Sequence, residues 1–114
     1  MDYIIVGSRK GANYRILREY LDKVTDIDCI ISGGASGVDT HAKIYAKRNN
    51  IPYVEYPANW DKHGRSAGWK RNNQMAWENQ QACVLAFYNG ESAGTAHWFK
   101  ITAELKMPLR IINL

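Results

Sequence analysis

Apolar residues in this chain follow two alternating patterns. Five short runs are apolar almost throughout, which is typical of strands covered on both faces of a sheet. Between these runs, apolar residues recur every three or four positions, which indicates amphipathic helices. The expected strands are Tyr3–Val6, Cys29–Ser32, Tyr53–Tyr56, Ala82–Phe87 and Leu109–Ile112, and the expected helices lie near Ile16–Val24, Val38–Ala46, Ala67–Gln80 and Ala96–Ala103.

The alternation of strands and helices predicts an α/β fold in which right-handed crossovers join parallel strands. The first and fourth strands carry no charged residue and suit central positions, whereas Glu55 in the third and Arg110 in the fifth suit edges. We therefore predict a three-layer Rossmann-like sandwich with a five-stranded parallel sheet in the order 3-2-1-4-5, forming a single domain over residues 1–114. Its ligand crevice is expected where the order reverses, between the first and fourth strands.

A glycine-rich turn from Ser32 to Asp39 connects the second expected strand to the second expected helix. Gly33, Gly34 and Gly37 allow a sharp turn and leave no Cβ between the main chain and a ligand. The helix that follows points its first N–H groups, and the positive end of its dipole, at this turn. These features are typical of a phosphate-holding loop, although the turn matches neither G-x-G-x-x-G nor the P-loop pattern.

Three more polar loops follow strand ends at the same edge of the predicted sheet. They are Gly7-Ser8-Arg9, the segment from Asn59 to Asn72, and the glycine-bearing turn Ser92-Ala93-Gly94-Thr95. The loops carry many basic side chains and few acidic ones. A basic rim around two helix N-termini predicts an anionic ligand. The basic residues concerned are Arg9, Lys10, Lys62, His63, Arg65, Lys70 and Arg71.

Several of these residues also suit purely structural roles. Ser36 and Ser92 are natural helix N-caps, and Asp39 stands three residues after Ser36, as in a capping box. Trp60 lies in a polar loop beside the crevice, where stacking on a base competes with simple packing. The remaining tryptophans lie on expected helices and are interpreted as core or subunit-interface anchors: Trp69, Trp77 and Trp98.

Composition narrows the function classes only moderately. Hydrophobic residues make up 46% of the chain and the net charge is +4, a mild value that does not by itself indicate nucleic-acid binding. Cys29 and Cys83 stand in apolar runs and are interpreted as small core residues, and no zinc-ligand spacing is present. We expect no metal and no cofactor. The N-terminus has no basic leader and no apolar run could span a bilayer, so a cytoplasmic location is expected.

These motifs resemble the YspA/cpYpsA-related group of the SLOG superfamily, over almost the whole chain. The resemblance implies a Rossmannoid fold that binds nucleotides or nucleotide-derived ligands, without implying one reaction. The superfamily also includes DprA and the Lonely Guy phosphoribohydrolases. The residues that carry the resemblance are Gly7-Ser8-Arg9, Ser32-Gly33-Gly34-Ala35-x-Gly37-Val38-Asp39, Trp60 with Gly64, Ala67-Gly68, Arg71-Asn72 and Met75, and Ser92-x-Gly94-Thr95.

One departure from the Lonely Guy pattern bears on catalysis. Those enzymes carry P-G-G-x-G-T followed closely by a catalytic glutamate, whereas here Ala96-His97-Trp98 follows Thr95 and the glutamate is absent. A hydrolytic reaction would therefore need another carboxylate. Asp39 is the first candidate and Asp61 the second, with Glu91 also available.

Three functions are consistent with these residues. The favoured one is nucleotide binding, in which amides of the two glycine turns hold phosphates, Ser8, Ser92 and Thr95 add hydroxyl groups, and Arg9 and Arg71 pair with phosphate oxygens. Trp60 or Asn72 would then meet the base or ribose. The alternatives are cleavage of an N-glycosidic or phosphoester bond, and single-stranded nucleic-acid binding as in DprA, against which the mild charge counts. Four tryptophans in so short a chain also predict a homodimer.

Overall fold

The structure is a computed structural model that describes all 114 residues of the chain. Its five strands form one parallel sheet in the order β3-β2-β1-β4-β5, so the predicted α/β class, parallel pairing and strand order are confirmed. The elements are β1 (Asp2–Gly7), α1 (Tyr14–Leu21), β2 (Cys29–Ser32), α2 (Val38–Arg48), β3 (Tyr53–Glu55), α3 (Trp60–His63), α4 (Ala67–Glu78), β4 (Cys83–Tyr88), α5 (Ala93–Leu105) and β5 (Leu109–Asn113).

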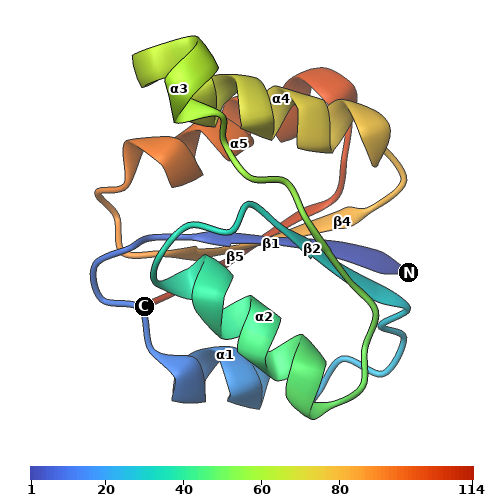
Figure 1. Cartoon of the computed structure of the whole chain (residues 1–114). Helices are drawn as coiled ribbons and strands as arrows, with labels where there is room; N and C mark the ends of the chain where they lie inside the picture. The colour runs from blue at the N-terminus through green and yellow to red at the C-terminus, as the bar shows by residue number, and fades with distance from the viewer.

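Helices cover both faces of the sheet (Figure 1). Helices α1 and α2 lie on one face, and α3, α4 and α5 lie on the other. Side chains alternate between these faces along β1, because successive residues of a strand point in opposite directions. Tyr3 and Ile5 join the core beneath α1 and α2. Ile4 and Val6 join the core beneath α4 and α5.

The central and edge strands differ in burial as their charge patterns predict. Ile4 of β1 lies between Ile31 of β2 and Val84 of β4, and all three side chains are buried. The edge strands are more open, since Val54 of β3 and Ile111 of β5 are 44% and 51% exposed. Two-sided coverage therefore favours apolar runs in the middle of the sheet and tolerates charge at its edges.

The segment after β3 contains more structure than its polar composition predicts. The Asn59 side chain accepts a hydrogen bond from the Lys62 amide at 3.1 Å and caps the four-residue helix α3. Gly64, at φ 55°, ends that helix and begins a 3₁₀ turn that runs to Ser66, just before α4. Four residues are too few to show helical periodicity, so this helix was missed.

Both cysteines are free thiols within strands, Cys83 buried and Cys29 half-buried, which agrees with their interpretation as small core residues. Among the helices, none combines the length and the apolar content that crossing a membrane requires.

Candidate functional site

A cavity of about 400 Å³ opens at the carboxyl edge of the sheet. It lies beside the reversal of strand order between β1 and β4, the usual position of a ligand crevice in an open parallel sheet. The chain turns from β1, β2 and β4 at this edge, on the left of Figure 1. The lining residues are Val6, Gly7, Ser8, Arg9, Lys10, Gly33, Ala35, Asp39, Arg71, Asn72, Met75, Asn89, Glu91, Ser92, Gly94, Thr95 and Trp98.

The loop after β1 is fixed against β4 by the backbone and side chain of Ser8. The Ser8 amide donates to the carbonyl oxygen of Phe87 at 3.0 Å, and Ser8 Oγ accepts from the Asn89 amide at 3.1 Å. Ser8 is only 1% exposed, and Oγ–H has no acceptor in the chain. A buried hydroxyl group with a free proton therefore lines the cavity wall.

The glycine turn between β2 and α2 packs directly on this first loop. Gly37 has φ 80°, and a Cβ there would stand 2.8 Å from the Cα of Arg9. Gly37 is also the N-cap residue of α2, and no side chain caps this helix. The predicted capping box of Ser36 and Asp39 is therefore wrong. Asp39 Oδ2 instead accepts from the Ala35 amide at 3.1 Å, across the turn.

Asp39 is one of two acidic residues that line the main cavity, the other being Glu91. It is 7% exposed, and this burial raises the pKa of its carboxyl to about 6. The amide hydrogen bond from Ala35 and the charges of Arg71 and Arg9 oppose the rise, but they only partly offset the cost of removing a carboxylate from water. Asp39 can therefore exchange a proton near neutral pH.

Arg71 connects helix α4 to the glycine turn. Its Nη1 donates to the Gly33 carbonyl oxygen at 2.6 Å and to that of Tyr56 at 3.4 Å, and its Nε donates to Asn72 Oδ1 at 2.9 Å. Burial lowers the pKa of Arg71, nearby Asp39 raises it, and Arg9 lowers it further. Neither Arg71 nor Arg9 makes an ion pair within the chain, and the Arg9 side chain makes no hydrogen bond there either. Two guanidinium groups thus line the cavity, and that of Arg9 has no partner in the chain.

Asn72 is held by a polar cluster behind the cavity wall. Its Nδ2 lies 3.3 Å from His97 Nδ1 and 3.5 Å from the Gly94 carbonyl oxygen, while its Oδ1 accepts from Arg71. The His97 ring lies against Trp69 with ring centroids 3.8 Å apart, and burial lowers the pKa of His97. Asn72 therefore connects α4 to α5 and has few polar atoms left for a ligand.

The N-terminus of α5 forms the opposite wall. Ser92 caps it, as predicted, because Ser92 Oγ accepts from the Thr95 amide at 3.2 Å and from Thr95 Oγ1 at 3.0 Å. The amides of Ala93 and Gly94 have no acceptor in the chain. Gly94 lines the cavity, so a helix of 13 residues presents this free N–H group to it.

A second cavity of about 140 Å³ adjoins the first. The two cavities share Arg9, Gly33, Ala35 and Arg71, so these four residues form their common wall. The remaining residues around the smaller cavity come from the glycine turn and from the segment after β3: Gly34, Pro57, Ala58 and Trp60.

The structure brings most of the predicted binding residues together. Ten line the main cavity: Gly7, Ser8, Arg9, Gly33, Asp39, Arg71, Asn72, Ser92, Gly94 and Thr95. Gly34 and Trp60 line the smaller one. Ser32 and Gly37 line neither, because Ser32 Oγ bonds Tyr53 Oη at 2.6 Å and Gly37 packs on Arg9. Asp61, the second catalytic candidate, also lines neither cavity.

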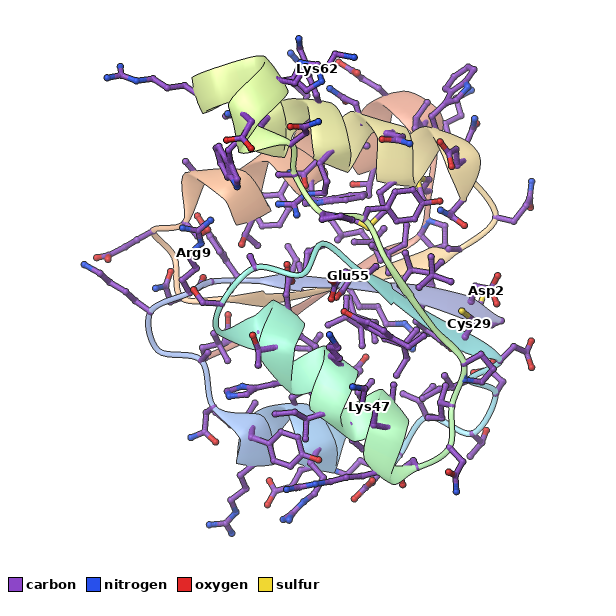
Figure 2. All side chains as sticks on the ribbon, in the orientation of Figure 1. Asp2, Arg9, Cys29, Lys47, Glu55 and Lys62 are labelled. Carbon is purple, nitrogen blue, oxygen red and sulfur yellow. The ribbon has the colours of Figure 1, made fainter.

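The basic rim is smaller than the sequence predicts. Lys10 joins Arg9 and Arg71 around the main cavity, but Lys62, His63, Arg65 and Lys70 line neither cavity. Lys70 Nζ lies 3.2 Å from His63 Nδ1, so these two residues contact each other. Figure 2 shows Lys62 on the outer side of α3, away from the sheet, whereas Arg9 lies at the sheet edge.

Five lining residues were not among the predicted binding residues, although two of them, Ala35 and Met75, stand in the motifs that carry the family resemblance. The five are Val6, Ala35, Met75, Asn89 and Trp98. Helical spacing could have indicated two of them, since Met75 lies three residues after Asn72 and Trp98 three after Thr95, on the same helix faces. No group of three His, Cys, Asp or Glu side chains is placed to hold a metal ion.

The fold and the cavity define a Rossmann-like α/β protein with a ligand-sized, polar cavity at the switch point of a parallel sheet. In a comparison with known protein families, the YspA, cpYpsA-related SLOG family matches residues 2–63. The chain belongs to this family. The matched residues include the first loop and the glycine turn, whereas Arg71 and the Ser92–Thr95 turn lie beyond them.

A curated protein is similar to this chain over a longer stretch than the family match. The chain is 32% identical over 85 residues to the Gene 61 protein of Mycobacterium phage D29, covering 70% of this chain and 67% of that protein. No solved structure matches the chain.

Proposed function

We propose that this protein binds a nucleotide or a nucleotide-derived ligand with its phosphates in the main cavity. The observation that carries the proposal is that two glycine-bearing turns open onto one cavity and are faced by a free guanidinium group. The α5 N-terminus offers the unpaired amides of Ala93 and Gly94, and Arg9 has no partner in the chain. A phosphate would satisfy both at once.

The main cavity also has the size and polarity that such a ligand needs. Its volume of about 400 Å³ lies within the usual range of small-molecule sites. Ser8 is 1% exposed and its hydroxyl proton has no acceptor in the chain, so this donor is already desolvated when a ligand arrives. Hydrogen bonds formed there would not compete with bulk water.

Calorimetry with a panel of nucleoside mono-, di- and triphosphates tests the proposal. Arg9→Ala is expected to weaken binding about tenfold or more, because a charge-assisted hydrogen bond to phosphate is lost. Lys62→Ala is the matched control, since Lys62 is an exposed basic residue that lines neither cavity, and it should bind as the wild type does. A folded protein that binds no nucleotide, or equal losses in both variants, would overturn the proposal.

Hydrolysis of the bound ligand is the second candidate, and Asp39 is the observation that favours it. Asp39 is the buried carboxyl group in the cavity wall with a pKa near neutrality, as a general acid or base requires. Chromatography of the products separates the two functions. If the wild type cleaves a bound nucleotide and Asp39→Asn binds but does not cleave it, the protein is an enzyme. If the wild type cleaves nothing that it binds, it is a binding protein.

A further inference from the structure

The smaller cavity differs chemically from the main one. Apart from the shared wall, it is lined by the backbone of Gly34 and by the apolar side chains of Pro57, Ala58 and Trp60. Trp60 is 52% exposed and stacks on no other ring of the chain. The open indole offers an apolar face on which a flat aromatic group could stack, which a phosphate could not do.

Trp60 lies near a glycine of helix α4. A Cβ at Gly68 would stand 3.7 Å from Trp60 Cη2, so the edge of the indole lies close to the helix at this point. The ring therefore has α4 beside it as well as the short helix α3 that carries it. A ring with a neighbour on one side has less conformational freedom to lose when a ligand stacks on it.

The shared wall connects the two cavities in a way that fits one ligand. Arg9 and Arg71 line both, and the charge of Arg9 lowers the pKa of Arg71, so the two guanidinium groups repel each other. An anion beside this wall would relieve the repulsion. A group attached to that anion would reach the main cavity on one side and Trp60 on the other.

We propose that the smaller cavity is a base subsite, in which the base of a nucleoside 5′-phosphate stacks on Trp60 while its phosphates pass Arg9 and Arg71 into the main cavity. This inference rests on the proposed function and deepens it. Asn72 is not the base-reading residue, because its amide is already hydrogen-bonded to Arg71 and lies against His97 and Gly94. The volume of about 140 Å³ holds a planar ring system but not a complete nucleotide.

The experiment compares ligands with and without a base. The wild type and Trp60→Ala are titrated by calorimetry with the diphosphates of adenosine, guanosine, cytidine and uridine, and with inorganic pyrophosphate. We expect the wild type to bind at least one nucleoside diphosphate more tightly than pyrophosphate. Trp60→Ala should weaken that nucleotide about tenfold and leave pyrophosphate unchanged, since only the base loses its stacking partner.

Two further variants keep the test sharp. Trp60→Phe retains an aromatic face and should keep most of the affinity for nucleotide. Ala58→Leu should fill the subsite, so it should weaken the binding of nucleotide and leave the binding of pyrophosphate unchanged. Trp77→Ala is the matched control, because Trp77 is 67% exposed and lines neither cavity. Nucleotide should quench tryptophan fluorescence in the wild type and in this control, but much less in Trp60→Ala.

The outcomes separate the two proposals. If neither pyrophosphate nor any nucleotide binds, the phosphate site fails and the base subsite fails with it. If pyrophosphate binds but no base adds affinity, or if Trp60→Ala weakens pyrophosphate as much as nucleotide, only the base subsite is wrong. Loss of nucleotide affinity alone, with recovery in Trp60→Phe, supports the subsite.

Discussion

Gly37 shows how a single residue holds two loops of the cavity together. Its φ of 80° is accessible mainly to glycine, and a Cβ there would meet the backbone of Arg9 at 2.8 Å and that of Ser8 at 3.0 Å. Backbone atoms cannot rotate away as the end of a side chain can. The turn and the first loop therefore approach closely only because position 37 carries no side chain.

We predict that Gly37→Ala is markedly more destabilising than Gly90→Ala. Gly90 also has positive φ, 89°, but nothing lies within 4 Å of its added Cβ. Gly90→Ala should cost about 1–2 kcal/mol of unfolding free energy for the backbone conformation alone. Gly37→Ala should cost about 1–3 kcal/mol more, because the loops are forced apart. Urea unfolding of both variants measures the difference, and equal losses would contradict the close packing.

Asp39 makes the stability of the protein depend on pH. Burial raises its pKa to about 6 from the ordinary 3.8, so ionising this group is harder in the folded protein than in the unfolded chain. The resulting penalty is fully present above about pH 6 and disappears as the pH falls toward 3.8, where both states are protonated. The buried carboxylate thus lowers the free energy of unfolding at neutral pH, a cost that is typical of functional sites.

We predict that Asp39→Asn raises the free energy of unfolding by about 1–3 kcal/mol at pH 7–8, with the gain vanishing near pH 4. The asparagine oxygen can still accept from the Ala35 amide, so the turn should keep its shape. Asp61→Asn is the control, because Asp61 is exposed and should show no such pH-dependent gain. Thermal unfolding from pH 4 to 8 gives the comparison, and a constant gain at all pH values would rule out the titration of Asp39 as its cause.

At the scale of elements, helix α5 uses its N-terminus both for its own stability and for the cavity. Ser92 Oγ caps the helix through the Thr95 amide, while the amides of Ala93 and Gly94 stay free. Helix α1 begins with a comparable cap, in which Asn13 Oδ1 accepts from the Arg15 amide at 2.9 Å, but Asn13 lines neither cavity. Substitutions at Asn13 should therefore change stability alone, whereas substitutions at Ser92 can change both stability and ligand binding.

We predict that Ser92→Asp keeps the stability of the wild type but weakens nucleotide binding at least about tenfold. Aspartate caps as well as serine does, yet it places a negative charge where a phosphate should sit. Ser92→Ala and Asn13→Ala should each lose about 1 kcal/mol of unfolding free energy. Calorimetry and urea unfolding on the same samples test both halves. If Ser92→Asp binds nucleotide as tightly as the wild type does, the phosphate does not bind at the N-terminus of α5.

The elements differ in how well the sequence predicts them. Strands such as β1 and β4 are recognisable because burial on both faces requires apolar residues throughout, and the glycine turn is recognisable because its sequence has a distinctive chemistry. Helix α3 was missed because it depends on one cap, from Asn59, and on Gly64, at which it ends.

The hydrogen bond from the Ala35 amide to Asp39 depends on the backbone conformation of the whole turn, which the propensities of single residues do not predict. The second cavity forms where the glycine turn packs beside the segment after β3, and Trp60 was the one residue of that segment predicted to lie near a ligand.

On the scale of the whole molecule, the tryptophans divide into two groups. Trp98 is 1% exposed and belongs to the core, as expected. Trp69 and Trp77 are 48% and 67% exposed, so the core interpretation is wrong for them. They stand eight residues apart on α4, which places them about 80° apart around the helix axis. Trp69 also packs on His97 of α5. Large aromatic residues in open positions are typical of surfaces that pair with a partner.

We predict that the chain forms a homodimer in which the outer side of α4 packs antiparallel on that of a second copy. Lys70 and Glu78 are exposed near opposite ends of this helix, so a two-fold axis would bring each lysine near the glutamate of the other copy. Light scattering should give twice the mass of the chain, and Trp77→Glu should give a folded monomer because it buries a charge at the contact.

Ile111→Glu is the matched control for the dimer. Ile111 is 51% exposed, but on the edge strand β5, so this change should leave the dimer intact. If Ile111→Glu dissociates the protein and Trp77→Glu does not, pairing runs through the sheet edge, where unpaired backbone groups of β5 are available. If the wild type is a monomer at high concentration, the predicted dimer is wrong, and the exposed Trp77 ring does not pair with a second copy of this chain.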